Sequence, residues 1–139
     1  MRRLLLFLTV FNSLLLASLV KNGDIVKDSV TNLMWQDSNN TSIQKSWIDA
    51  INYCENLTLG GYSDWRLPNI VELESIIDRN KINFALSSIF ENVSFNLYWS
   101  STTYSHDTTS AWVVDFYDGS NAISSKDNNN SVKCVRGGN

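Results

Sequence analysis

Apolar residues recur at helical spacing in the first half of the chain. Trp47, Ile51 and Cys54 stand at positions i, i+4 and i+7, so they would share one face of a helix. The pattern becomes helical at about Ser42, and the glycine pair at 60–61 is typical of a helix end. We therefore predict a helix between these points, with Cys54 on its buried face.

A second helix is predicted directly after Pro68, the only proline of the chain. Asn69, with Glu72 three residues later, fits a capping box, and apolar residues then recur at helical spacing. This helix would begin at Asn69 and end near Asp78. One more short helical turn is predicted within residues 83–90.

Strand-like runs lie on both sides of these helical segments. Residues 25–28 and 33–35 are two short β-like runs, and the polar residues 29–32 between them predict an opening hairpin. In the second half, residues 98–102 are strand-like and residues 111–117 alternate between two faces.

The end of the chain continues this β pattern. Asp118-Gly119 indicates a tight hairpin turn, followed by a return strand at 120–125. Residues 132–136 predict a last strand that places Val132 and Cys134 on one side. Helices first and antiparallel strands later predict an α+β domain.

The first residues read as a targeting segment. An apolar run over residues 4–20 follows Met1-Arg2-Arg3, which is the pattern of a signal peptide at 1–20. The alternative is an uncleaved membrane anchor, because the run is nearly long enough to span a bilayer. Residues 21–139 have the length of a single domain.

Charge argues against one class of partner. The chain has 11 Lys and Arg and 14 Asp and Glu, a net charge of −3. Removing Arg2 and Arg3 with the leader would make the mature protein more acidic, and no cluster of basic residues is visible. Nucleic acid is therefore not expected as a partner.

The chain has two cysteines, Cys54 and Cys134. An exported chain enters a compartment where thiols oxidise, so we predict that they form a disulfide. The alternative is two separate buried thiols. A bond closing a loop of this length would contribute about 4.5 kcal/mol of stability in the chain-entropy model.

Several sequence blocks occur in the order found in one protein family, over nearly the whole mature chain. The blocks are Leu33-Met34-Trp35-Gln36-Asp37, Tyr53-Cys54, Gly61-Tyr62-Ser63-Asp64-Trp65-Arg66-Leu67-Pro68-Asn69, Tyr98-Trp99-Ser100-Ser101, Ala111-Trp112 through Gly119, and Cys134-Val135-Arg136. Together they resemble the DUF1566 family, also called the Lcl C-terminal domain.

The resemblance implies a fold similar to C-type lectin domains and to the formylglycine-generating enzyme domain. Two helices would pack on a twisted antiparallel sheet with long loops, and a disulfide would join the first helix to the last strand. Two departures from the family affect turns: Asn32 stands where the family usually has Gly, and Phe84 where it often has Pro.

We predict no enzyme activity, no cofactor and no metal. Copper-dependent cysteine oxidation, as in the formylglycine-generating relatives, needs a reactive cysteine pair, which a structural disulfide would consume. The sole histidine, His106, cannot form a metal site without other strong ligands. Asp107, Asp115 and Asp118 are oxygen ligands for calcium in principle, but the proline-containing loop of calcium-dependent lectins is absent.

The region from 98 to 130 is rich in Tyr, Trp, Ser, Thr, Asn and Asp, which is typical of recognition surfaces. The candidate ligand-binding residues are Trp99, Tyr104, His106, Asp107, Trp112, Asp115, Tyr117, Asn121 and Asn128. An equally good interpretation of Trp99 and Trp112 is that they are core residues. The alternative interpretation of His106 is a solvated loop residue. Trp65, Arg66, Pro68 and Asn69 are interpreted as a structural motif between the helices, in which Arg66 pairs with Asp64 or Glu72.

Two functions follow from these observations. The first is an exported binding module, secreted, periplasmic or on the cell surface, that recognises a glycan or a cell-surface protein through these loops. The second is a structural or assembly protein of the cell envelope, whose surface forms a homo-oligomer such as a trimer. Membrane contact is expected only if the leader is retained.

Overall fold

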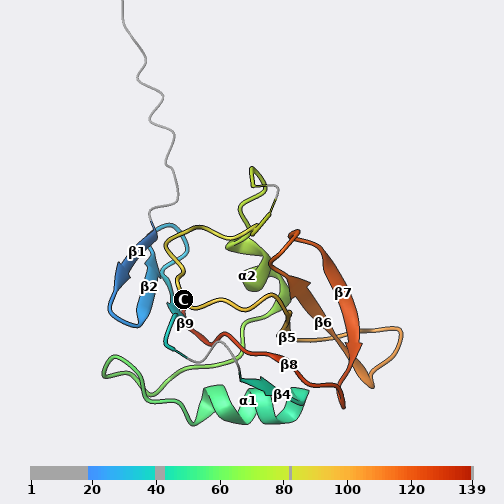
Figure 1. The fold of residues 1–139 in the computed structure, drawn as a ribbon. Helices are drawn as coiled ribbons and strands as arrows, with labels where there is room; N and C mark the ends of the chain where they lie inside the picture. Colours follow the sequence, from blue (N-terminus) through green and yellow to red (C-terminus); the bar gives the residue numbers. More distant parts are fainter. Residues whose placement is uncertain (1–18, 40–42, 82, 139) are drawn as a thin grey trace, which may run out of the picture.

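The computed structural model describes residues 19–39, 43–81 and 83–138. These residues form two sheets and two helices (Figure 1). The α+β class is therefore confirmed. The described part contains more strand than helix. No helix in it is long and apolar enough to cross a membrane.

The first sheet has the strand order β1-β2-β3-β9, and every neighbouring pair in it is antiparallel. Its strands are β1 (Leu19–Asn22), β2 (Ile25–Asp28), β3 (Leu33–Gln36) and β9 (Val135–Gly137). The first and last described strands thus belong to one sheet. The opening hairpin formed by β2 and β3 is confirmed.

The second sheet has the order β4-β8-β5-β6-β7. Its strands are β4 (Gln44–Lys45), β8 (Asn130–Ser131), β5 (Leu97–Thr103), β6 (Ser110–Asp115) and β7 (Asn121–Ser125). The expectation of one antiparallel sheet is wrong, because there are two sheets and β8 pairs parallel to β5. Only the end of the predicted last strand at 132–136 is found: residues 135 and 136 belong to β9, whereas residues 132–134, with Val132 and Cys134, are not strand and connect the two sheets.

Both predicted helices exist but are shorter than expected. Helix α1 (Trp47–Glu55) begins after Ser46, whose hydroxyl accepts a hydrogen bond from the Asp49 N–H, and its C-cap is Asn56 rather than the glycine pair. The predicted start at about Ser42 lies outside the described residues, and the strand β4 directly precedes the helix cap.

Helix α2 (Ile70–Ser75) has the predicted capping box, in which Asn69 and Glu72 exchange side-chain and backbone hydrogen bonds. It ends before Asp78, because the Asp78 N–H donates to the Ala85 carbonyl and Ile77 forms a β-bridge with Leu86. The predicted helical turn within 83–90 is wrong, since these residues are held by such bridges and turns.

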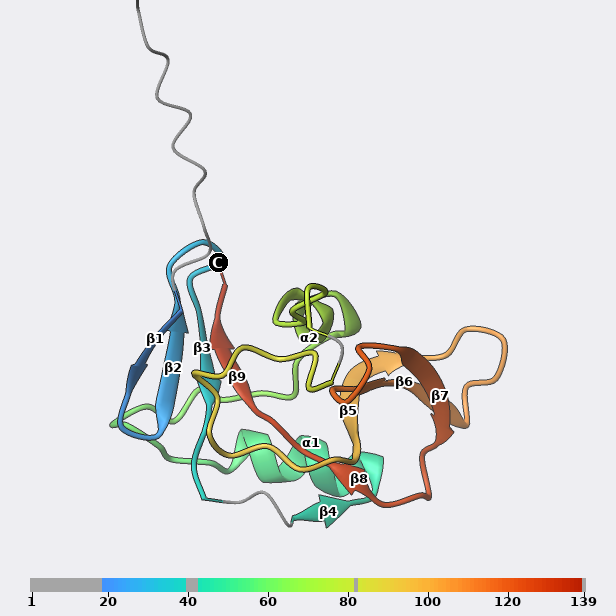
Figure 2. The same cartoon turned by 45° about the horizontal axis from the view of Figure 1, so that its top comes forward.

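The core has two clusters, one on each face of β6. Val114 packs with Tyr98, Phe116 and Leu73 of α2 in the first cluster. Val113 packs with Trp99, α1 and the cysteines in the second. Figure 2 shows the two helices apart from each other, α2 in the upper and α1 in the lower part of the view. A strand buried on both faces explains why Val113 and Val114 are both fully buried despite the alternating pattern.

Asn32 and Phe84 are the two non-glycine residues with positive φ in the described part of the chain, at 58° and 57°. Asn tolerates this left-handed conformation, whereas proline, which fixes φ near −65°, could not adopt the conformation seen at Phe84. Asn32 lies between β2 and β3, and Phe84 lies between α2 and β5, outside the helices and strands.

Candidate functional site

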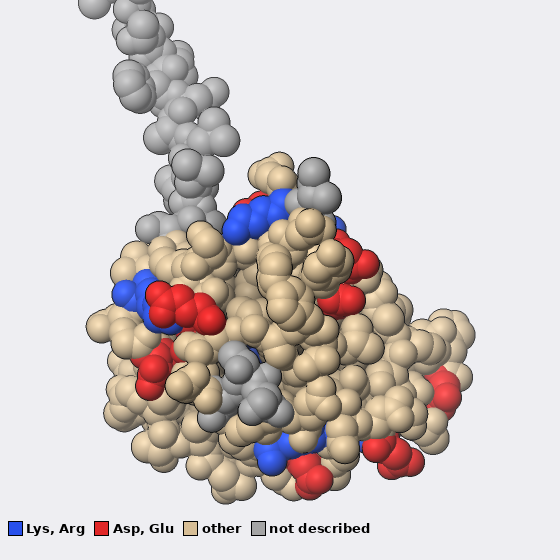
Figure 3. All heavy atoms as spheres, in the orientation of Figure 1, with Lys and Arg blue, Asp and Glu red and all other residues tan. Residues whose placement is uncertain are grey.

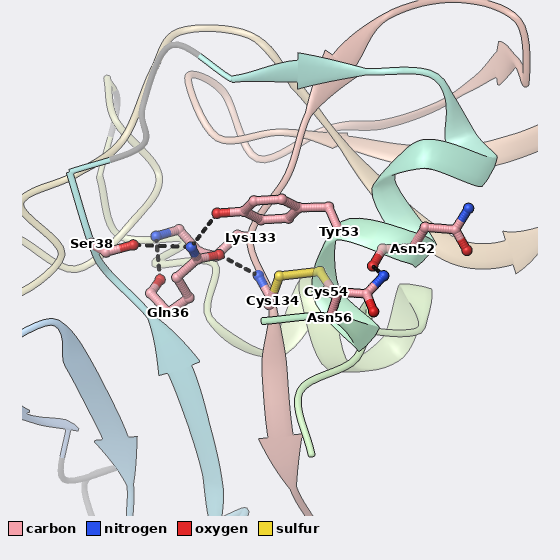
Figure 4. Close-up of a disulfide and its surroundings, with 8 residues drawn as sticks. All are labelled: Gln36, Ser38, Asn52, Tyr53, Cys54, Asn56, Lys133 and Cys134. Carbon is pink, nitrogen blue, oxygen red and sulfur yellow. Dashed lines mark hydrogen bonds between the residues drawn. A yellow bond between two sulfur atoms is a disulfide. The ribbon is translucent and has the colours of Figure 1, made fainter. Parts of the chain in front are cut away.

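The disulfide between Cys54 of α1 and Cys134, the residue before β9, is confirmed. Figure 4 shows Gln36 beside it: the Gln36 side chain donates to the Tyr53 hydroxyl at 2.9 Å and accepts from the Cys134 N–H at 3.1 Å. The bond and this amide bridge join α1 to the end of the first sheet. Both thiols are consumed, and the described residues include no free cysteine.

The Trp65-Arg66-Leu67-Pro68 block lies between the two helices and against the C-terminal strand. Trp65 is 2% exposed and its indole N–H faces the carbonyls of Leu59 and Tyr62. The backbone of Arg66 bonds in both directions with Val135. Pro68 is fully buried, and its carbonyl accepts from the Ser101 N–H at 2.8 Å. These contacts are all structural.

Of the two partners expected for Arg66, Glu72 is the one found. The guanidinium forms a bidentate pair with Glu72, at 2.6 and 2.7 Å. Asp64 instead pairs with Arg136, at 2.6 Å. Burial alone would raise the pKa of Glu72, but the hydrogen bonds from Arg66 and the Asn69 N–H hold that pKa below its ordinary value.

Three of the predicted contact residues form an aromatic cluster where β5 ends and β6 begins. The Tyr104 ring lies 5.3 Å from the His106 ring and 5.4 Å from the Trp112 ring, the latter edge to face. His106 is exposed, whereas Tyr104 and Trp112 are half-buried. We call these three residues the Tyr104 cluster.

The loop that carries the Tyr104 cluster is held by its own hydrogen bonds. The N–H of Tyr104 donates to the Ser110 carbonyl at 2.9 Å, and the Ser110 N–H donates to the Asp107 carbonyl at 3.0 Å. The carboxylate of Asp107 accepts from the hydroxyl and N–H of Thr109, at 2.6 and 3.0 Å. The Thr109 hydroxyl and N–H lower the pKa of Asp107. The predicted contact residue Asp107 thus fixes the loop.

The opposite end of β6 carries a second exposed aromatic group. The Phe84, Phe95 and Tyr117 rings contact one another with centroid distances of 4.3 to 6.1 Å. Their exposed fractions are 42%, 63% and 46%. We call these residues the aromatic triad. A hollow of about 490 Å3, lined by Phe84, Leu86, Phe90 and Val93 among others, lies beside it.

The other predicted contact residues are distributed between these places. Asp115 accepts from the Tyr117 N–H, and exposed Asn121 donates to Glu74 of α2, both near the triad. Asn128 lies in the loop after β7 and donates to Ser124. Trp99 is fully buried and donates to the Lys45 carbonyl, so the core interpretation holds for it and it cannot contact a ligand. The candidates therefore form no single site.

The aspartates considered as calcium ligands serve separate turns. Asp107, Asp115 and Asp118 each accept from the backbone N–H two residues later. In the part of the chain that the structure describes, no group of three or more His, Cys, Asp or Glu residues is placed to hold a metal ion.

The surface seen in Figure 3 carries few charges. Lys, Arg, Asp and Glu side chains occur there in small groups separated by neutral surface. Lys133 and Asp37 are instead internal: their side chains are 3% and 0% exposed and lie 3.4 Å apart.

Sequence reasoning missed Phe84 and Phe95 as surface residues. Phe84 is followed by Ala85 and Leu86, and Phe95 alternates with Val93 and Leu97, so the local sequence pattern favours burial for both. Nothing local indicates that they meet Tyr117. It also missed Lys126, which donates to Thr103 at 2.9 Å and lies 4.0 Å above the Trp47 ring. These contacts join residues far apart in the sequence.

Comparison with known proteins gives one family. A search of curated proteins found no match. The model of the Lcl C-terminal domain matches residues 24–136, which include the disulfide, the structural block and both aromatic groups. The chain therefore belongs to the Lcl C-terminal domain family.

Proposed function

We propose that this protein is an exported, non-catalytic binding module that recognises a glycan or a protein surface through the Tyr104 cluster. The observation that carries the proposal is the fixed presentation of the Tyr104 and His106 rings on a loop closed by Asp107 and Ser110, beside Trp112 of β6. A loop already ordered by its own bonds loses little entropy on binding.

The chemistry of the cluster suits a neutral ligand. Tyr, His and Trp offer ring faces for the apolar side of a sugar or for apolar side chains, together with polar atoms for hydrogen bonds. Exposed Ser105 and Thr108 lie in the same loop, and exposed Asn128 lies in the loop after β7, where the Lys126 N–H donates to the Thr109 carbonyl. The sparse charge on the face shown in Figure 3 also favours contacts that do not depend on ionic attraction.

The proposal extends to the fold and the location. Two helices, the disulfide from α1 to the C-terminal segment, and first and last strands in one sheet are consistent with a C-type lectin-like domain. The disulfide and the apolar leader support a secreted, periplasmic or cell-surface location. Because both thiols are bonded, cysteine oxidation chemistry has no reactive pair here.

Binding of the purified protein to glycan arrays and to host-surface protein arrays tests the proposal. The variant Tyr104→Ala/His106→Ala removes two rings of the cluster and leaves the loop bonds of Asp107 in place. The variant Tyr117→Ala, at the other end of β6, is the matched control, because it also removes an exposed ring.

We expect the double variant to lose at least about tenfold in affinity for any ligand found, and the control to keep it. Loss in the control alone would move the site to the aromatic triad. Equal binding by both variants and the wild type would reject recognition through either group.

A second candidate is a structural or assembly protein of the cell envelope, which the aromatic triad favours. Three mutually contacting rings with 42% to 63% exposure are unusual on a surface that remains in water. Sedimentation of the wild type and of Phe95→Ser tests this candidate. A trimer that dissociates in the variant would support assembly, whereas a protein whose oligomeric state is unchanged by the substitution would not.

A further inference from the structure

Strand β7 forms an open edge of the second sheet. It pairs only with β6, and Figures 1 and 2 both show it at the outer border of the described part, with no strand or helix beyond it. Asn121, Ala122, Ile123 and Ser125 are exposed, Ile123 at 47%.

The register determines which residues direct their backbone groups outward. The N–H of Asp115 donates to the Ser120 carbonyl, and the N–H of Lys126 donates to the Thr109 carbonyl. Hydrogen-bonded and non-hydrogen-bonded pairs alternate along an antiparallel ladder. In the register of β6 with β7, Asn121, Ile123 and Ser125 are therefore the residues whose N–H and C=O groups point away from β6.

This edge lacks the features that usually prevent strands from pairing between molecules. Natural edge strands are protected by lysines, prolines, bulges or a covering element. The sequence of β7 is Asn-Ala-Ile-Ser-Ser, without charge or proline, and its register with β6 is continuous. Of the outward carbonyls, Ser125 accepts one bond, from the Asn128 N–H.

We propose that two copies of this chain associate through β7, with the strands antiparallel and a two-fold axis at Ile123. Ile123 would then exchange both backbone hydrogen bonds with Ile123 of the second copy. Asn121 of each copy would pair with Ser125 of the other, so that every outward N–H of the strand gains an acceptor. The β7-containing sheets of the two copies would then form one continuous sheet.

A second copy fits this edge because the edge is its own complement. The outward N–H and C=O groups at 121, 123 and 125 are placed symmetrically about Ile123, so the same pattern is presented in both directions. The Ser125 carbonyl, which already accepts from the Asn128 N–H, would accept a second bond from Asn121 of the other copy. The chain carries a net charge of −3, yet β7 is neutral, so its pairing brings no like charges into direct opposition. The two Ile123 side chains would lie side by side and cover each other.

Sedimentation equilibrium of the purified protein over a range of concentrations tests this proposal. The variant Ile123→Pro removes the central outward N–H but no bond to β6, because Ile123 is not hydrogen-bonded to Trp112. Ile123→Val keeps the N–H and a β-branched side chain and is the matched control. Amide hydrogen exchange of the wild type at low and high concentration gives a second measurement that needs no variant.

We expect a monomer–dimer equilibrium whose dissociation constant rises at least about tenfold in Ile123→Pro and changes less than about threefold in Ile123→Val. We also expect the Ile123 amide to exchange more slowly at high concentration. A wild type that stays monomeric at about 1 mM, a trimer, or an Ile123 amide whose exchange is independent of concentration would overturn the proposal. Failure of ligand binding through the Tyr104 cluster would leave these measurements unaffected.

Discussion

The ammonium of Lys133 lies 3.4 Å from a carboxylate oxygen of Asp37, and neither side chain reaches solvent appreciably. Lys133 also donates to the Gln36 carbonyl at 2.9 Å. Asp37 accepts from the backbone N–H groups of Glu91 and Asn92, at 2.9 and 3.0 Å. The pair thus joins the end of β3 to the long segment before β5, which carries part of the aromatic triad.

Removing Asp37 should destabilise the protein more than removing Lys133. Asp37→Ala removes the carboxylate that accepts from the buried Lys133 ammonium, the Lys21 ammonium and two backbone N–H groups. Lys133 keeps the Gln36 carbonyl and Lys21 keeps Glu91, but Lys133 loses its only nearby opposite charge among the described residues. Loss of one partner of a buried pair costs about 3 to 5 kcal/mol. Lys133→Met leaves Asp37 with Lys21 and both amides, so we expect a smaller loss. Urea denaturation of both variants measures the difference, and a greater loss in Lys133→Met would contradict this account.

Stability should rise with pH on the alkaline side. Burial lowers the pKa of Lys133 from 10.5 to about 8, and Asp37 only partly offsets this effect. Between pH 8 and 10.5 the unfolded chain therefore binds more protons at this residue than the folded chain, so the free energy of unfolding increases with pH. Between pH 8 and 10.5 the free energy of unfolding should increase by on the order of 3 kcal/mol. Denaturation at pH 7.5 and 10 measures it, and Lys133→Met, the control, should lack it.

Acid should destabilise the protein through Asp37, so the free energy of unfolding rises with pH in this window as well. Burial alone would raise the pKa of Asp37, but the Lys21 hydrogen bond, the Glu91 amide and the Lys133 charge together lower it. A carboxyl with a lowered folded pKa stabilises the protein above its unfolded pKa, and this contribution is lost as pH falls through the folded value. We expect the free energy of unfolding to fall below about pH 4 in the wild type. In Asp37→Asn this acid loss should be smaller.

Reduction of the disulfide should remove a large part of the stability. Cys54 and Cys134 are 80 residues apart, so reduction increases the conformational entropy of the unfolded chain. We expect the free energy of unfolding to fall by about 4 to 5 kcal/mol. The double variant Cys54→Ser/Cys134→Ser should show the same loss and no response to reductant. Mass measurement after thiol alkylation gives the companion result: two alkylated cysteines in the unreduced exported protein would contradict the bond.

The elements that the sequence predicted well are those with local causes. The α2 capping box depends on Asn69 and Glu72, which are three residues apart, and the β2–β3 hairpin on adjacent runs. The ends of the helices were less predictable. Residues 76 and 77 continue an apolar helical pattern, but the Asp78 amide bonds to Ala85, a partner that periodicity does not reveal.

The candidate contact residues were predictable where their contacts are local in the sequence. Tyr104, His106 and Trp112 are close in sequence, and the structure brings them together. Tyr117 instead meets Phe84 and Phe95 through tertiary packing, and the packing of α1 against β5 places Trp99 in the core. Contacts between distant segments decided these positions, and a single sequence does not display them.

Glu72 should contribute more to stability than its helix neighbour Glu74. Glu72 accepts from the Asn69 N–H at 3.0 Å and forms the bidentate pair with Arg66. Glu74 accepts one surface bond, from Asn121. We expect a loss of about 2 kcal/mol for Glu72→Ala and less than about 1 kcal/mol for Glu74→Ala, since the Arg66 side chain is partly exposed and its charge is screened. Thermal denaturation measures the stability of both variants. Equal losses would contradict the larger contribution expected for Glu72.

Phe84 offers a test of backbone strain that is separate from its ring contacts. Its φ of 57° lies in the left-handed region, which a residue with a Cβ occupies at a cost of about 1 to 2 kcal/mol and glycine occupies freely. Phe84→Ala and Phe84→Gly both remove the contacts with Phe95 and Tyr117, but only the glycine removes the strain. Glycine also adds entropy to the unfolded chain, which opposes this gain by somewhat less than 1 kcal/mol. We therefore expect Phe84→Gly to be more stable than Phe84→Ala by about 0.5 to 1 kcal/mol in urea denaturation, the reverse of the order found in a helix or strand. If alanine is the more stable variant, the turn at Phe84 is not strained in solution.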